Sequence, residues 1–416
     1  MFLGKRCVKV GKTLDGTKSE CGSERFTWAF QVDVGPPGGR RDQRIRAGFK
    51  TKAAAVEAMA KMQKEIADHT HVEPSRLTVG RYLLQWLEAG SWSGNATRDY
   101  RVAIERHINP RIGDVPLQAL TTVQIRGLYS HLARNGLVRE RKADDGTTTK
   151  TEGPLSPKSI HNVHICLRSA LNAAIEDRLL PANPALKAHT FSRTKHRPEM
   201  KTWTAEEVRR FLNFTVQDRG GALYRIALMT GLRRGELLGL RRRELDLDAG
   251  RLHVRQQYTR DGDRGLKFKG LKTGSNAWRT VDLDPTTVAA LRGHLAAQEF
   301  ERRSWGDAYC RDLDLVFCHP DGSPLDPDEA TRRFERRSGE AGVLVIRLHD
   351  ARHTHATLLL ENGESLKYVA ERLGDREDTV LQVYQHVTAK TRAQAPSRLA
   401  ALIDLGDECD RVVIAL

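Results

Sequence analysis

The sequence has little that would place the protein in a membrane or stabilise it outside the cell. No apolar run approaches the roughly 18 residues that a membrane span requires, and the N-terminal MFLGKRCVKV is too short and too charged for a signal peptide. The six cysteines show no CxxC spacing and no regular framework, at positions 7, 21, 166, 310, 318 and 409. These absences argue against a membrane or secreted protein and favour a reduced intracellular compartment, the cytoplasm.

Acidic residues are also in deficit. The 416 residues include 68 Lys and Arg against 53 Asp and Glu, which gives a formal net charge of +15. This balance is unusual for a metabolic enzyme and indicates a polyanionic partner, most simply nucleic acid. The length suffices for two or three domains. Cys7 and Cys21 could share a metal ion, but no pair of histidines accompanies them, so a metal site is not expected there.

Residues 1–72 have the pattern of a small basic domain. Apolar residues alternate from Phe26 to Val32, a turn rich in Gly and Pro follows, and a second alternating stretch surrounds Ile45. The alanine-rich segment 50–69 has the apolar spacing of a helix. Arginines beside the second strand indicate either a solvated charged face or, as the better hypothesis, a DNA contact: Arg40, Arg41, Arg44 and Arg46.

Residues 76–186 predict a second domain of four or more helices. Several of these helices begin with capping residues, and Pro157 lies just inside the start of the last one. The polar insert 138–155, VRERKADDGTTTKTEGPL, predicts a flexible loop rather than a strand or helix. A basic stretch punctuated by three prolines, residues 179–200, leads to the next domain, and residues 187–200 are its linker.

The third domain, residues 201–393, begins with a capping-box-like TAEE at Thr204. Helices predominate, with strands and turns between residues 251 and 283, and a tail of residues 394–416 follows. The predicted fold class is therefore mainly α with small β-sheets: a sheet-plus-helix domain, a helical domain, and a mixed domain that is mostly helical.

The first stretch whose residues could bind a ligand or catalyse a reaction is TGLRRGELLGL, residues 230–240. Thr230-Gly231 ends an apolar helix, and Arg233 stands at the start of the next. An arginine there is suited to hold a phosphate, because the helix start also offers free N–H groups. Glu236 follows one turn later and could orient the guanidinium. A surface arginine beside a terminal glycine would give the same pattern.

A second stretch, GLKFKGLKTGSNAWRTVDL, resembles a phosphate-binding P-loop. Gly265, Gly270 and Lys272 suggest that motif, but Leu271 intrudes before the lysine and no long helix follows. A polar turn leads instead into a strand-like RTVDL, so nucleotide binding is rejected. A lysine on a hairpin turn is mobile and can reach a neighbouring site.

The third stretch is HDARHTHAT, in which Arg352 follows His349 by three residues, so that the two lie on one helix face, and His353 follows His349 by four. A metal pair of His349 and His353 is one alternative, but the stretch lacks the intervening glutamate of zinc proteases, and Arg352 would repel the cation. A phosphate fits better, because Arg352 offers a two-pronged donor and His349 a further one. Asp350 in the first turn suits the helix dipole.

In their order and approximate spacing these stretches resemble the tyrosine recombinase (phage integrase) family. Alone, a tyrosine in LGDREDTVLQVYQHVT would be typical of core packing. The residues that carry the resemblance are Arg233, Lys272, His349, Arg352 and, in YQHV, Tyr384. The helical middle is similar to the family's core-binding (SAM-like) domain, and residues 1–72 are similar to the arm-binding domain of integrases from mobile elements.

The resemblance implies a DNA strand transferase without a cofactor or metal. Tyr384 would attack a phosphodiester to give a 3′-phosphotyrosyl link and a free 5′-hydroxyl. Arg233, Arg352 and His349 would neutralise the charge that develops on the phosphoryl oxygens, and Lys272 would protonate the leaving oxygen. Religation would need no ATP, since the link to the protein stores the phosphodiester energy.

The sequence departs from the family at Asp375, nine residues before the tyrosine, where relatives usually carry His or Trp. An ionised carboxylate cannot donate a hydrogen bond to the phosphate. Asp375 could be protonated, could orient an arginine such as Arg352, or could cap a helix after Gly374. Orienting or capping is favoured, because cationic neighbours lower the pKa of a carboxyl group.

The expected partners are double-stranded DNA attachment sites, three further copies of the chain in a homotetramer on DNA, and an accessory directionality factor. The expected location is the cytoplasm, in association with the nucleoid, and no membrane partner is expected. Two alternatives remain open: a DNA-binding architectural protein that has lost the chemistry, and a nicking-closing enzyme like the type IB topoisomerases.

Phosphate contacts should dominate the affinity for DNA, so binding to a short core duplex should fall steeply with salt. If six or more phosphates are held, the affinity should drop by roughly 10³-fold or more between about 50 and 200 mM salt. Fluorescence anisotropy at several salt concentrations measures this slope. A nearly flat response would contradict a clamp built on phosphate contacts.

Overall fold

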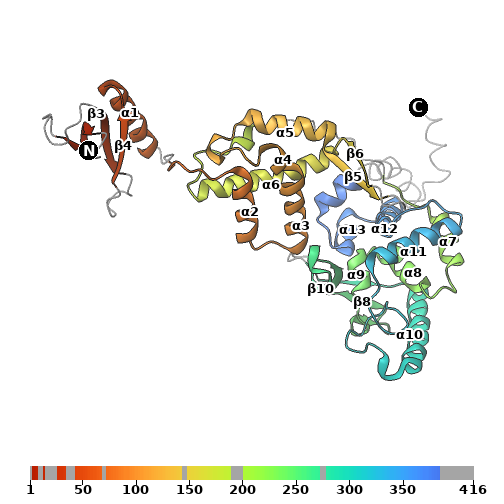
Figure 1. Ribbon diagram of the computed structural model, residues 1–416. Helices are drawn as coiled ribbons and strands as arrows, with labels where there is room; N and C mark the ends of the chain where they lie inside the picture. The colour runs from red at the N-terminus through yellow and green to blue at the C-terminus, as the bar shows by residue number, and fades with distance from the viewer. Residues whose placement is uncertain are drawn as a thin grey trace, which may run out of the picture. The chain divides into compact units, whose positions relative to one another are not determined.

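Helices and a few short antiparallel strands make up the chain (Figure 1). The computed structural model describes residues 2–7, 13–14, 26–33, 43–67, 72–142, 148–188, 200–271 and 278–384. Two units separate at residues 195 and 196, and each is internally packed. The predicted mainly α fold with small sheets is confirmed. In the described ranges no helix is long and apolar enough to cross a membrane.

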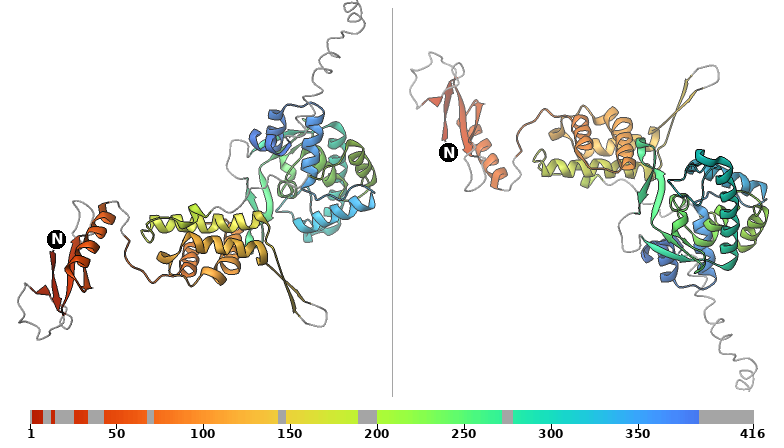
Figure 2. Two further views of the ribbon diagram at one scale, coloured as in Figure 1. Left: turned by 90° about the horizontal axis from the view of Figure 1, so that it is seen from above. Right: turned by 90° about the horizontal axis from the view of Figure 1, so that it is seen from below.

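The N-terminal sheet has four antiparallel strands in the order β2-β1-β3-β4. One helix, α1, packs on β3, and Figure 2 shows the helix lying against the strands of this sheet. Phe30 and Val32 of β3 are buried against Ala55 and Met62 of α1, so the predicted alternation places one face of the strand in the core. The first two strands were not predicted, because their sequence lacks an apolar alternation. The bounds are β1 Phe2–Cys7, β2 Thr13–Leu14, β3 Phe26–Asp33, β4 Gln43–Phe49 and α1 Lys52–Ala67.

The helical part of the first unit forms where the sequence predicts it. Thr121 begins α5 with a complete capping box, and Ser156 caps α6 with Pro157 in its first turn. A π-helical turn, Ala103–Ile108, separates α3 from α4 and contributes the buried Ile104 to the core. The helices are α2 Val79–Ala89, α3 Gly94–Val102, α4 Asn109–Ile112, α5 Thr122–Asn135 and α6 Pro157–Glu176.

The polar insert between α5 and α6 is a strand pair, so the prediction of a flexible loop was wrong. Strand β5, Leu137–Lys142, pairs with β6, Thr148–Gly153, in an antiparallel register that sets Glu140 opposite Lys150. Threonine and valine, which the composition of the insert supplies, have a high propensity for extended backbone. Composition alone indicated disorder because the insert contains almost no apolar residues.

The second unit packs helices around an aromatic core. Trp203, Phe211, Tyr224 and Phe334 are buried with ring centroids 4.9 to 5.6 Å apart. The predicted capping box at Thr204 is confirmed. The helices are α7 Ala205–Phe214, α8 Gly221–Thr230, α9 Arg234–Leu238, α10 Pro285–Trp305, α11 Pro327–Glu340, α12 Asp350–Glu361 and α13 Leu366–Leu373, and residues 377–384 are helical as well.

Two small sheets border these helices. A three-stranded sheet has the order β11-β8-β7, and β9 pairs with β10 in a separate hairpin. The predicted strand after the lysine turn is confirmed as β11. The bounds are β7 Leu245–Asp246, β8 Arg251–Val254, β9 Gln256–Arg260, β10 Leu266–Gly270 and β11 Arg279–Asp282. The linker residues 189–199 and the tail 394–416 lie outside the described residues.

The aromatic core should dominate the stability of the second unit. Phe334→Ala removes a fully buried ring and should lower the free energy of unfolding by about 3–5 kcal/mol. Phe300→Ala is the matched control, because this ring on α10 is 75% exposed, and the change should stay within about 0.5 kcal/mol. Urea titration followed by circular dichroism measures both values. Equal losses in the two variants would show that the aromatic cluster is not the core of the unit.

Candidate functional site

Arg233 lies between the end of α8 and the start of α9. Gly231 ends α8 with a left-handed backbone, φ +65°, and a Cβ there would approach the His355 ring to 2.7 Å. The Arg233 guanidinium donates from Nη1 to Glu236 Oε1 (2.8 Å) and from Nη2 to the Gly374 carbonyl (3.0 Å). The backbone N–H of Arg233 donates to Glu236 Oε2 (2.9 Å), so that N–H is not free for a phosphate.

Glu236 is 2% exposed and joins two arginines. It accepts from Arg233 on one side and, on the other, from Nη2 of Arg279 at 2.7 Å. Burial alone would raise the pKa of Glu236, but the hydrogen bond and charge of Arg279 and the charge of Arg233 hold that pKa below its usual value. Glu236 is therefore an anion that fixes the guanidinium of Arg233.

The sequence reasoning missed Arg279. Its side chain is 6% exposed, and its Nε donates to the carbonyl of Arg372 at 2.9 Å. Arg279 is the first residue of β11, so these bonds hold the strand that follows Lys272 against α9 and α13. A basic residue at the start of a strand was the available signal, but it is too common to identify a buried role.

Arg352 of α12 is the most deeply buried cation of the site, at 4% exposure. Its Nη1 donates to the Gly231 carbonyl (2.7 Å), and its Nη2 donates to the Leu373 carbonyl (2.9 Å) and to Asp375 Oδ2 (2.5 Å). Burial and the nearby Arg233 lower the pKa of Arg352, while Asp375 opposes this change. The guanidinium is thus held at a fixed position by the ends of two helices and one carboxylate.

Asp375 lies between the two arginines. Its Oδ1 accepts from Arg233, and its Oδ2 accepts from Arg352. Of the roles considered from the sequence, the structure places this carboxylate where it orients the arginines, and its side chain caps no helix among the described residues. The side chain is 25% exposed, so solvent reaches it from one direction.

Three aromatic side chains complete the site. His349 stands at the N-terminus of α12, and its ring centroid lies 5.3 Å from that of His353 one turn later. Nδ1 of His353 lies 2.7 Å from the hydroxyl oxygen of Tyr384, which is 3% exposed. Burial raises the pKa of Tyr384 well above its usual value, and the charges of Arg352 and Asp375 also act on it.

Other candidates stand apart from this cluster or outside the described residues. Lys272 lies outside them, as do Arg40 and Arg41. On β4, Arg44 and Arg46 form ion pairs with Glu73 at 3.6 and 3.4 Å while remaining partly exposed. Such surface pairs are weak, so an incoming anion can replace Glu73 at both arginines.

Asp350 forms a local ion pair on α12. It accepts from Nε of Arg347 at 3.0 Å and from Nη2 at 2.8 Å. No group of three or more His, Cys, Asp or Glu is placed to hold a metal ion in the part of the chain that the structure describes.

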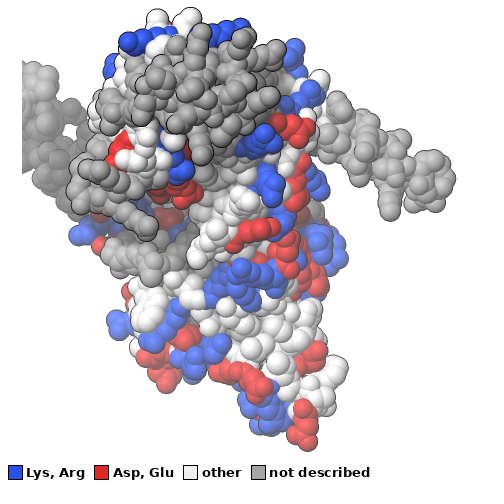
Figure 3. Space-filling view, turned by 60° about the vertical axis from the view of Figure 1, so that its left-hand side comes forward, with Lys and Arg blue, Asp and Glu red and all other residues white. Residues whose placement is uncertain are grey.

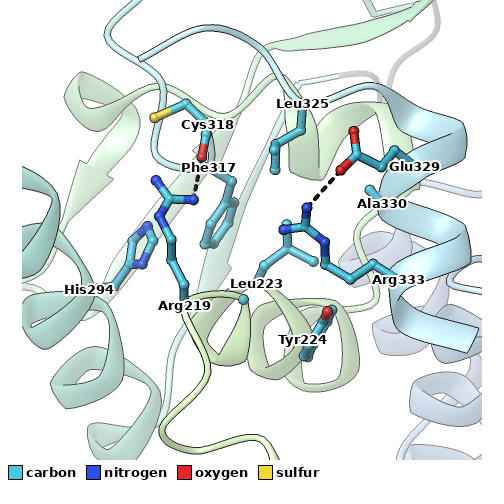
Figure 4. A pocket seen from close by; sticks show the side chains of 11 residues that line it. Arg219, Leu223, Tyr224, His294, Phe317, Cys318, Leu325, Glu329, Ala330 and Arg333 are labelled. Carbon is cyan, nitrogen blue, oxygen red and sulfur yellow. Dashed lines mark hydrogen bonds and ion pairs between the residues drawn. The ribbon is translucent and has the colours of Figure 1, made fainter. Parts of the chain in front are cut away.

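A small pocket at a different place in the second unit is unsuited to a ligand. It lies between α8, α10 and α11, with a volume of about 30 Å³ (Figure 4). Arg219 crosses it to the carbonyl of Cys318 at 2.7 Å, and Arg333 pairs with Glu329 at 2.7 Å. A space of this size holds about one water molecule, and its two arginines already have partners.

Surface charge is mixed on the face that Figure 3 shows, where groups of Lys and Arg are flanked by Asp and Glu. Among the ion pairs of the second unit, Arg292 pairs with Asp248 and Arg219 pairs with Glu301 at 2.6 Å each. The site is therefore distinguished by the burial of Arg352 and Arg279 rather than by a concentration of surface charge.

Two guanidiniums fixed around one anion, beside a buried phenol, form an arrangement suited to phosphoryl transfer. The donors neutralise charge on phosphoryl oxygens without reorganising during the reaction. Three regions of the chain match known families: the phage integrase family (residues 201–391), the arm DNA-binding domain (22–66) and the phage integrase N-terminal SAM-like domain (78–133).

Relatives and solved structures agree with these matches. The chain is 26% identical to the ICEBs1 integrase of Bacillus subtilis, over 90% of this chain and 97% of that protein. It is 26% identical to a XerC-like tyrosine recombinase of Caldanaerobacter subterraneus, over 85% of this chain and 91% of that protein. Its fold is similar to that of the Tn1549 transposon integrase in complex with transposon right end DNA, with a TM-score of 0.61 and 20% identity. The match covers 78% of this chain and 99% of the integrase chain. The chain belongs to the tyrosine recombinase (phage integrase) family.

Proposed function

We propose that the chain is a site-specific DNA recombinase, an integrase that cuts and rejoins DNA through a 3′-phosphotyrosyl intermediate to integrate or excise a mobile element. The observation that carries this proposal is the convergence of Arg233 and Arg352 on a single anion, Asp375. The residue after Arg352, His353, lies 2.7 Å from the hydroxyl oxygen of Tyr384, so the tyrosine belongs to the same site. The same guanidiniums can hold the scissile phosphate.

In the proposed reaction the Tyr384 oxygen attacks the phosphorus, and the bond from phosphorus to the 5′ oxygen breaks. Arg233 and Arg352 stabilise the negative charge on the other phosphoryl oxygens, and His349 donates a further hydrogen bond. Lys272 gives a proton to the leaving 5′ oxygen. A 5′-hydroxyl from the same or another duplex reverses these steps, and no external energy source is needed.

The other domains would select the DNA. Residues 22–66 match an arm DNA-binding domain, and Arg44 and Arg46 on β4 are partly exposed there, so distal arm sites are their proposed target. The SAM-like domain and the catalytic domain would hold the core site. Deleting residues 1–72 would then weaken arm-site binding and spare cleavage of a core duplex.

The DNA partner is proposed by analogy with similar solved structures, and the assembly from the resemblance to the family. Solved relatives are described in complex with transposon right end DNA and, for the XerH recombinase, bound to a palindromic difH substrate. We infer that this chain binds double-stranded attachment sites, acts as a homotetramer on DNA with an accessory directionality factor, and works in the cytoplasm at the nucleoid.

Tyr384→Phe should bind DNA normally and form no covalent adduct, because only the phenolic oxygen is removed. A nicked suicide substrate and denaturing gel electrophoresis reveal the adduct. Tyr224→Phe is the matched control, because Tyr224 is another buried tyrosine of the same unit, 3% exposed, and should leave the adduct unchanged. Adduct formation by the Tyr384→Phe variant would exclude Tyr384 as the nucleophile. Normal binding without an adduct in the unchanged protein would favour an architectural DNA-binding role.

Asp375→Asn should reduce the cleavage rate by about tenfold or less, because the amide oxygen still accepts from one of the two arginines and the bound phosphate supplies acceptors for the other. Asp375→His should be tolerated or slightly faster, since it supplies a hydrogen-bond donor to the phosphate, and preorganised donors of this kind stabilise the transition state. Single-turnover cleavage rates measure both effects. Loss of the adduct in both variants with DNA binding intact would make Asp375 a catalytic group in its own right.

A further inference from the structure

The hydrogen bond between His353 and Tyr384 has no role in the reaction as described so far. Nδ1 of His353 lies 2.7 Å from the Tyr384 hydroxyl oxygen, and the ring centroids are 6.0 Å apart. The two residues come from α12 and from the helical segment 377–384, which pack together through Ala356, Leu360 and Val380. A histidine at this distance from a nucleophilic oxygen has the geometry of a base paired with its nucleophile.

The surroundings of His353 keep its ring able to accept a proton. Burial and the charges of Arg352 and Arg347 lower the pKa of His353, and the carboxylates of Asp350 and Asp375 oppose this without reversing it. The neighbouring His349, whose pKa is also lowered, faces the same ring. The ring is therefore neutral near pH 7, and the phenol donates to Nδ1 while Nε2 carries the hydrogen.

Tyr384 needs such a partner. Burial raises the pKa of its hydroxyl well above 10, so the phenolate is not present in advance of the attack. The proton must leave while the bond to phosphorus forms. Arg352 cannot accept it because a guanidinium remains protonated, and Asp375 is already shared by two arginines.

We propose that His353 is a catalytic residue of this chain, the general base that takes the phenolic proton from Tyr384; this rests on the proposed recombinase function. The proton moves from the Tyr384 oxygen to Nδ1 of His353 as the oxygen–phosphorus bond forms. The bond from phosphorus to the 5′ oxygen breaks, and that oxygen receives a proton from Lys272. In religation His353 returns its proton to the tyrosine oxygen as the 5′-hydroxyl attacks.

The structure also separates His353 from the phosphate-binding residues. Arg352, the preceding residue, points to Gly231, Leu373 and Asp375, whereas His353 points to Tyr384, because neighbours on a helix diverge by about 100°. His353 also lines an open pocket of about 350 Å³ with Asp350 and Glu335. Through this pocket the imidazole can exchange its proton with solvent between one reaction cycle and the next.

The test compares two leaving groups at the scissile phosphate: the natural 5′ oxygen and a 5′-bridging sulfur. A thiolate leaves without a proton, so sulfur makes the general acid dispensable and leaves the need for a base unchanged. His353→Asn keeps an acceptor near the position of Nδ1 but cannot take a proton. It should cleave about 10²-fold or more slowly on both substrates. Lys272→Ala should be slow on the oxygen substrate and recover on the sulfur substrate.

The control is His319→Asn, a histidine elsewhere in the same unit, which should cleave both substrates at the normal rate. Duplex binding and circular dichroism verify folding, and His353→Gln serves as a second variant if the Asn variant is unstable. A His353→Asn rate within tenfold of normal would reduce His353 to holding Tyr384 in place. A faster rate would mean that the hydrogen bond from His353 inhibits Tyr384. A cleavage rate restored to normal on the sulfur substrate would mean that His353 acts on the leaving group instead.

Failure of the recombinase proposal looks different from failure of this one. If the unchanged protein forms no tyrosyl adduct on either substrate, the proposed function itself is wrong. If it forms the adduct on both and the His353 variants match it, only the assignment of the base is overturned.

Discussion

The site depends on keeping the guanidinium of Arg352 buried. Removing a charged group from water costs several kcal/mol unless hydrogen bonds and an opposite charge replace the solvent. The guanidinium of Arg352 donates to the carbonyl groups of Gly231 and Leu373 and to the carboxylate of Asp375. These acceptors lie where α8 and α13 end. The positions of both helix ends are therefore set by the cation that they surround.

Two glycines make this arrangement possible. Gly231 and Gly374 end α8 and α13 in the left-handed conformation, which turns their carbonyl groups towards the site. The Gly231 carbonyl accepts from Arg352, and the Gly374 carbonyl accepts from Arg233. A side chain at Gly231 would also collide with His355 and Leu373. The glycine in TGLRRGEL is thus required both for its backbone and for the close approach of two helices.

Local signals in the sequence were sufficient for the helices and for the order of the chemical motifs. Thr204, Pro157 and Gly231 mark helix ends through contacts within a few residues, which a sequence pattern can reveal. The pairs that complete the site are distant in the chain: Glu236 with Arg279 across 43 residues and His353 with Tyr384 across 31. No periodicity encodes such pairs, because tertiary packing decides which faces meet. The β5–β6 pair was missed for a different reason, since threonine-rich polar segments are compatible with both loop and strand.

The basic side chains of α12 point in different directions, and each has a different partner. Arg352 meets the anion, His353 meets the tyrosine, and His355 is buried with Nδ1 at 2.9 Å from the carbonyl of Leu228. Burial lowers the pKa of His355 to about 3, and the pKa values of His349 and His353 are lowered as well. The histidines therefore add hydrogen-bonding capacity without adding positive charge next to two guanidiniums. A carboxylate at position 375 fits the same requirement, because it separates Arg233 from Arg352 and offsets their repulsion before any phosphate arrives.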